Sequence, residues 1–108
     1  MTVIELAETT GFAIVSLPDP KREVKGAYIG DLLSWVMGRA NQDNIWITIM
    51  SNINVIAVAS LADVSCVILC EDVSLEDDVL KAAKEKGINI ISTSLSSYET
   101  AVKISGII

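Results

Sequence analysis

The stretch Ile45-Trp-Ile-Thr-Ile-Met50 carries bulky or semi-apolar side chains at every position, which is typical of a strand buried on both faces of a sheet. Asn52, a residue type that favours helix starts, precedes an apolar helical segment over residues 53–61. Residues 64–70 form another apolar run without alternation. Strand, helix and strand joined by short connections predict parallel strands covered by helices.

The same order continues toward the C-terminus. A helix is predicted over residues 75–86, opened by a capping box of Ser74 with Asp77 and ended by Gly87. Residues 88–91 then form the next apolar strand. The second half of the chain therefore alternates strands and helices, which indicates an α/β protein.

Capping boxes also mark the first and last helices. Thr2 with Glu5 predicts a short helix that Gly11 ends. Ser96 with Glu99 predicts the last helix before the C-terminus. The inward face of that last helix is expected to carry Tyr98, Ala101 and Val102.

The remaining part of the first half is predicted to add two strands, over residues 12–16 and 23–29, on either side of the turn Pro18-Asp-Pro20. Because no helix joins them, at least one antiparallel pair is expected in the sheet. Asp31 is expected to cap the following helix. One face of that helix is predicted to carry Leu32, Leu33, Val36, Met37 and Ala40.

These elements predict a single domain over residues 1–108, with three layers: a mixed, mostly parallel sheet flanked by helices. With 51% hydrophobic residues among 108, the chain can fill one core. Eight Lys and Arg against 14 Asp and Glu give a net charge of -6, which disfavours a nucleic-acid partner. The absence of histidine excludes imidazole bases and Ser-His or Cys-His nucleophile pairs.

No basic start precedes an apolar stretch at the N-terminus, and the longest apolar run, residues 55–59, is far below the roughly 20 residues that a membrane span needs. We therefore expect a cytoplasmic protein without a membrane segment. Cys66 and Cys70 fall in one predicted strand, where their Cα atoms would be about 13 Å apart, so they are expected to be free structural thiols. Glu71 and Asp72 should raise the Cys70 pKa.

Four segments resemble the DRTGG domain family. They are Lys21-Arg-Glu-Val-Lys-Gly-Ala-Tyr-Ile-Gly-Asp31, Asp43-Asn-Ile-Trp-Ile-Thr-Ile-Met-Ser-Asn52, Asn54-Val-Ile-Ala-Val-Ala-Ser60 and Ile90-Ile-Ser-Thr-Ser-Leu-Ser96. The motif that names the family keeps Arg22 and Gly26 here but lacks its leading Asp. The resemblance implies the α/β fold of the N-terminal domain of HPr kinases and assigns no catalytic activity. Family members occur within phosphotransacetylases, beside CBS domains, or alone near hydrogenase or sensor-kinase genes, which implies protein partners of those kinds.

Ligands in α/β sheets bind outside the carboxyl ends of the parallel strands. The side chains expected there are small and polar, and we predict that any ligand binds where they converge, with Arg22 as a basic group at the rim. The candidate residues are Asp31, Ser51, Asn52, Thr93 and Ser94. The alternative is that several of them only cap helices. The acidic residues from Glu71 to Asp78 are expected to be a solvated helix start, so no metal or other cofactor is predicted.

Two features predict a homodimer. Trp35 lies off the apolar stripe of its helix, and residues 53–61 are apolar on nearly all sides, which in a small domain indicates burial against a partner. Ile53, Val55 and Ile56 join Trp35 as candidate interface residues. The alternative is a helix end covered by a loop of the same chain.

The sequence thus favours a non-enzymatic regulatory or sensor domain, dimeric, that binds a small ligand, a nucleotide among the candidates, or a partner protein. A second hypothesis is an interaction module whose dimer face is its whole function. An enzyme that uses a carboxylate such as Asp31 as acid or base is disfavoured, because nothing in the sequence pairs two catalytic groups.

Overall fold

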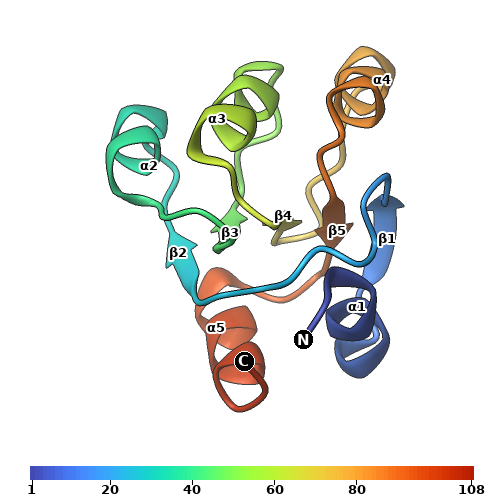
Figure 1. Cartoon of the computed structure of the whole chain (residues 1–108), viewed down its shortest axis with the longest axis vertical. Helices are drawn as coiled ribbons and strands as arrows, with labels where there is room; N and C mark the ends of the chain where they lie inside the picture. Colours follow the sequence, from blue (N-terminus) through green and yellow to red (C-terminus); the bar gives the residue numbers. More distant parts are fainter.

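A computed structural model describes residues 1–108. Five strands form one sheet in the order β1-β5-β4-β3-β2 (Figure 1). Neighbouring strands from β2 to β5 run parallel, and β1 runs antiparallel to β5. The strands are β1 (Ala13–Ser16), β2 (Ala27–Ile29), β3 (Ile45–Thr48), β4 (Cys66–Leu69) and β5 (Ile90–Ser92). The predicted mixed, mostly parallel sheet is confirmed.

The turn at Pro18 indicated an antiparallel pair of β1 with β2, but β1 pairs with β5 instead. Strands β1 and β2 lie at opposite edges of the sheet, and Ala13 of β1 pairs with Ser92 of β5. Four strand spacings of about 4.8 Å separate the two edges, and about ten extended residues reach well beyond that distance. The connection crosses beside the first helix, where Val3 N donates to Arg22 O at 3.0 Å.

Helices cover both faces of the sheet (Figure 1). Helices α1 (Val3–Thr10) and α5 (Ser97–Ser105) lie on one face, and α2 (Leu33–Arg39), α3 (Asn54–Ala62) and α4 (Asp77–Lys86) lie on the other. Within β3, Trp46 packs in the core under α2 to α4, whereas Ile45 and Ile47 pack in the core under α1 and α5. This double burial explains why the central strands are apolar at every position.

Two of the predicted caps form as expected. The capping boxes of Thr2 with Glu5 and of Ser96 with Glu99 are both complete. Gly11 ends α1 and Gly87 ends α4, each at a φ of 74°, the left-handed region that glycine adopts without a steric penalty.

Two other predicted caps are wrong. Helix α4 begins at Asp77 after Glu76, without a side-chain cap, so Ser74 plays no part in it. Helix α2 begins at Leu33 and has no side-chain cap either. The Asp31 carboxylate instead accepts hydrogen bonds from Thr48 Oγ1 and Ile49 N at the end of β3.

Several predicted helix faces also need correction. On α5, Thr100 and Ile104 face the sheet, whereas Tyr98 is 77% and Val102 56% exposed. Thr100 is accommodated because its hydroxyl lies 3.4 Å from the Cys70 sulfur. On α2, Val36 is buried but Leu32 and Met37 are exposed.

Two of the α3 residues that were predicted to contact a second subunit are buried in this chain's own core. Val55 and Ile56 are 0% and 2% exposed within the core of this chain, so they cannot contact a second copy. Ile53 remains about half exposed. None of the five helices has both the length and the apolar character needed to cross a membrane.

Candidate functional site

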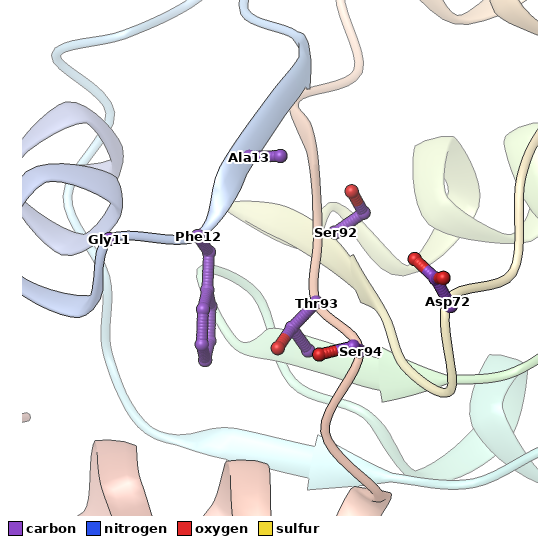
Figure 2. A pocket seen from close by; sticks show the side chains of 7 residues that line it. All are labelled: Gly11, Phe12, Ala13, Asp72, Ser92, Thr93 and Ser94. Carbon is purple, nitrogen blue, oxygen red and sulfur yellow. The ribbon is translucent and has the colours of Figure 1, made fainter.

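A cavity of about 260 Å³ opens where the end of β5 meets the start of β1 (Figure 2). Helix α1 ends at Gly11, whose left-handed backbone turns the chain into β1. Since β1 runs antiparallel to β5, the first residues of β1 lie beside the carboxyl end of β5. The lining residues are Gly11, Phe12, Ala13, Asp72, Ser92, Thr93 and Ser94.

The loop after β4 brings Asp72 to this cavity through an unusual backbone. Glu71 and Asp72 both have left-handed φ angles, 60° and 59°, and Val73 N donates to Cys70 O across them. Consecutive left-handed residues that are not glycine cost of order 1–3 kcal/mol each. The loop after β5 holds them in place, because Glu71 N donates to Leu95 O and Asp72 N donates to Thr93 O. Strain held in this way is common at functional sites.

Several polar groups of the cavity are not used by the fold. Thr93 Oγ1 accepts a hydrogen bond from Leu95 N at 3.2 Å. The hydroxyls of Ser92 and Ser94 and the carboxylate of Asp72 make no hydrogen bond within the chain, and Figure 2 shows the Asp72 carboxylate directed toward the end of β5. These groups are therefore free to bind a ligand.

The other predicted ligand residues form a second group at the same edge of the sheet. Asp31 Oδ1 accepts from Thr48 Oγ1 at 2.8 Å and from Ile49 N at 2.9 Å, which ties the end of β2 to the end of β3. Asn52 Oδ1 accepts from Asn54 N at 2.9 Å, and Ser51 precedes it. Strand β4 separates β3 from β5, so this group lies about 10 Å from the cavity.

Arg22 lies at the opposite end of the sheet from both groups. Its guanidinium donates to Asp43 Oδ1 at 2.9 Å, to Asp63 Oδ1 at 2.8 Å and to the Asp63 carbonyl at 2.7 Å. Asp43 and Asp63 precede the amino ends of β3 and β4. Burial opposes the charge, but the hydrogen bonds to Asp63 and Asp43 outweigh it and raise the Arg22 pKa.

Arg22 therefore holds two loops together, and its donors are not available at the predicted rim of the ligand site. The motif glycine has a similar structural role. Gly26 has a φ of 73°, and a Cβ there would lie 3.3 Å from the amide nitrogen of Asn44. In this chain, the two residues kept from the family's naming motif are explained by the architecture.

Both cysteines are free and buried, as the sequence predicted. Burial raises the Cys66 pKa to about 12. The Cys70 pKa is also raised, mainly by burial, and the nearby carboxylates of Glu71 and Asp31 act in the same direction. Burial thus raises the Cys70 pKa more than the adjacent acidic residues do, although the sequence prediction was based on those residues. Glu71 follows the end of β4 and Asp31 bonds to the end of β3, so the carboxyl edge of the sheet carries acidic side chains.

The acidic residues after β4 fall in two structural settings. Asp77 and Asp78 lie in the first turn of α4, where the helix dipole favours them. No group of three or more Cys, Asp or Glu side chains is placed to hold an ion. The predicted helix start is therefore confirmed for Asp77 and Asp78, whereas Glu71 and Asp72 lie in the left-handed turn that precedes it.

Sequence reasoning placed Asp72 and Ser92 at strand ends but missed Gly11, Phe12 and Ala13 as part of a site. A glycine that ends a helix was visible in the sequence. Its position beside Thr93 depends on the pairing of β1 with β5, which joins residues about 80 positions apart and has no local signal.

A group of exposed apolar side chains lies at the carboxyl ends of β2 and β3. The Asp31 carboxylate accepts a hydrogen bond from Ile49 N, which joins the ends of β2 and β3, and Trp35 lies in the first turn of α2, four residues after Asp31. Arg39 stacks on the Trp35 ring at 3.9 Å, and that ring is 54% exposed. We call this group the apolar corner; it comprises Ile29, Leu32, Trp35, Ile49 and Ile53.

Comparisons with known proteins address the fold and the family. None of the curated proteins compared with the chain matches its sequence. A similar solved structure is the crystal structure of the CBS and DRTGG domains of the regulatory region of Clostridium perfringens pyrophosphatase, complexed with the activator diadenosine tetraphosphate. It superimposes with a TM-score of 0.67 at 16% identity, over 90% of this chain and 43% of the other. The likeness shows a shared fold, and this chain spans less than half of that protein's solved chain.

The sequence itself assigns the family. The family model described as the DRTGG domain matches residues 5–107, which includes all five strands and most of every helix. This chain belongs to the DRTGG domain family.

Proposed function

We propose that this chain is a non-enzymatic regulatory domain that binds a small ligand at the carboxyl edge of its sheet. The observation that carries the proposal is the cavity beside the strained turn at Asp72, with two hydroxyls and a carboxylate that the fold leaves unbonded. Ligand binding there would act on the Asp72 turn and on the loop after β5, which are joined by two backbone hydrogen bonds. The ligand state could thereby be transmitted to a partner protein.

Family membership supports regulation as the class of function. The similar DRTGG-containing structure is a regulatory region complexed with a nucleotide activator. We propose that residues 1–108 act as one such domain and that its partner is a separate protein, with a hydrogenase or a sensor kinase as the kinds that the family resemblance implies.

The chemistry of the chain supports binding rather than catalysis. There is no histidine, and both thiols are held protonated at neutral pH by their raised pKa values. Asp31, the carboxylate considered as an acid or base, bonds through Oδ1 to the end of β3. Each candidate catalytic group thus has a structural role.

The charge distribution predicts which nucleotides bind best. Asp31, Glu71 and Asp72 lie at the carboxyl edge, whereas Arg22 pairs with Asp43 at the other end of the sheet. A triphosphate would therefore meet several carboxylates at this edge. We expect affinity to fall in the order nucleoside, monophosphate, triphosphate.

A thermal-shift screen of nucleosides, nucleotides and small metabolites tests the proposal, because a specific ligand stabilises the folded state by RT ln(1 + [L]/Kd). Calorimetric titration of the best compounds follows, on the wild type, Asn52→Ala and Asn41→Ala. Asn41 is an exposed asparagine outside the site and serves as the matched control. Affinity that rises with phosphate number, or a screen in which no compound stabilises the protein, would contradict the proposal.

The apolar corner supports a second candidate function, a homodimerisation module. Ile29, Leu32, Trp35, Ile49 and Ile53 are each at least 42% exposed. Large exposed apolar groups that gather on one side of a small domain mark interaction surfaces. Of the four predicted interface residues, Trp35 and Ile53 remain candidates, because Val55 and Ile56 are buried in this chain's own core.

A further inference from the structure

We propose that the cavity beside Asp72 selects a small organic cation, with its ammonium group paired to the Asp72 carboxylate and its apolar body beside Ala13, which faces the same side of the sheet as Ser92 (Figure 2). The inference rests on the proposed function and names the chemical class of ligand for one part of the carboxyl edge. It follows from the charge, the unbonded groups and the size of the cavity.

The charge of the cavity favours a cation. Asp72 is the one charged residue among the seven that line it. Gly11 ends α1, so the cavity also lies at the C-terminal end of a helix, where the backbone dipole is negative. Glu71 adds a second carboxylate in the same turn. An anionic ligand would meet repulsion from each of these groups.

The Asp72 carboxylate has no partner in the protein. All four ion pairs of the chain involve other residues: Met1 with Glu23, Arg22 with Asp43 and Asp63, and Lys25 with Asp43. Lys103 of α5 lies with its Nζ 5.4 Å from the centre of the Phe12 ring and forms no ion pair with Asp72. The Asp72 carboxylate is therefore available to an ammonium group of a ligand.

The shape of the cavity defines the rest of the ligand. A volume of about 260 Å³ is slightly below the roughly 300–1,000 Å³ of pockets for drug-sized molecules, so the ligand is small. The volume exceeds that needed for a bare metal ion, which would also require several oxygen ligands rather than one carboxylate. Ala13 provides a small apolar wall beside Ser92, and the unbonded hydroxyls of Ser92 and Ser94 provide hydrogen bonds.

Three probes of nearly equal size separate charge from shape: 2-phenylethylamine, 2-phenylethanol and phenylacetate. Each is titrated into the 15N-labelled full chain, and amide chemical shifts report both the site and the affinity. The amine should shift the amides of Gly11, Asp72 and Thr93 and bind about three- to fivefold more tightly than the alcohol, the ratio expected for one partly exposed ion pair. Phenylacetate should bind most weakly.

Asp72→Asn tests the assigned partner directly. Asparagine tolerates the left-handed backbone at this position, so the turn should be retained while the charge is lost. In this variant the amine and the alcohol should bind equally. Asp77→Asn, an exposed aspartate in the first turn of α4, is the matched control and should keep the preference for the amine.

Two results would overturn the inference: amine binding no tighter than that of phenylacetate, or a preference for the amine that persists in Asp72→Asn. The thermal-shift screen and the three probes together test the proposed function separately from the cation site. If a compound from the thermal-shift screen binds at residues 31 and 51–52 while none of the three probes binds the cavity, the cation site is refuted and the regulatory function stands. If neither the screen nor the probes yield binding anywhere at the carboxyl edge, both proposals are refuted.

Discussion

Arg22 illustrates how a residue type can indicate one role and serve another. A guanidinium ahead of a helix is suited to bind an anionic ligand, and the motif position supported that interpretation. In the structure the same fork geometry binds two aspartates of this chain. The side chain is about three-quarters buried, so its hydrogen bonds contribute to folding.

We predict that Arg22→Lys lowers the free energy of unfolding by about 1.5–3 kcal/mol, because lysine cannot bridge Asp43 and Asp63 together and each hydrogen bond to a charged group contributes in this range. Urea unfolding followed by Trp fluorescence measures the change. Lys21→Ala, which removes an exposed neighbouring charge that forms no ion pair, should leave the midpoint unchanged. An Arg22→Lys protein of wild-type stability that loses ligand affinity would show that Arg22 serves the ligand after all.

Because of the buried Cys66 thiol, we predict that the free energy of unfolding falls as the pH rises above 9. Its pKa is about 12 in the folded chain and 9.0 without burial, so above pH 9 the unfolded state binds fewer protons than the folded state. Stability contributed by this thiol is complete below pH 9 and is lost as the pH rises toward 12, by about 1.4 kcal/mol per pH unit. Urea unfolding at pH 8 and pH 10 should show a steeper loss for the wild type than for Cys66→Ala. Parallel losses in both proteins would be incompatible with this assignment.

At the level of single elements, the sequence predicted best where the cause is local. The boxes at Thr2 and Ser96 depend on residues three positions apart, and both form. Ser74 has the same local spacing to Asp77, but the turn after β4 moves the helix start two residues further along the chain. Asp31 likewise bonds to β3 instead of its own helix.

A matched test of helix capping is provided by Ser96, which caps α5, and Ser74, which does not cap α4. Ser96→Ala removes an acceptor that the structure places on the Glu99 amide and should destabilise the protein by about 1 kcal/mol. Ser74→Ala removes no cap and should change stability by less than about 0.5 kcal/mol. Thermal unfolding of both variants decides the point. Equal destabilisation would mean that Ser74 caps α4 in solution.

The strands show the complementary limit of sequence analysis. Apolar runs such as residues 45–48 identify β3 and β4 as central, because only a strand covered on both faces excludes polar residues. The partner of β1 had no such signal, since strand pairing between distant segments depends on the packing of the whole chain. The cavity could not be predicted from the sequence for this reason, because it exists only where β1 meets β5.

At the scale of the whole molecule, the candidate ligand site and the candidate dimer surface lie at the same end of the sheet. The exposed apolar corner lies beside Asp31 at the carboxyl edge, whereas Arg22 and Lys25 pair with Asp43 at the opposite end. A ligand and a second subunit would therefore both meet the same end of the protein. Binding of one could be coupled to binding of the other.

Dimerisation through the apolar corner predicts that Trp35→Lys abolishes self-association at micromolar concentration, because it places a charge in an apolar contact. Sedimentation equilibrium compares this variant with the wild type. Tyr98→Lys changes an exposed aromatic residue on α5, on the other face of the sheet, and should leave the dimer intact. A wild-type monomer, or a dimer that only Tyr98→Lys disrupts, would exclude the apolar corner as the interface.

The location of the ligand is the point on which the regulatory function depends. The most direct measurement is an amide chemical-shift map of the 15N-labelled chain with the most stabilising compound from the screen. We predict saturable shifts confined to the carboxyl edge, at residues 11–13, 51–52, 71–72 and 92–94. Shifts centred instead on Arg22, Asp43 and Asp63, at the opposite end of the sheet, would contradict the proposed site.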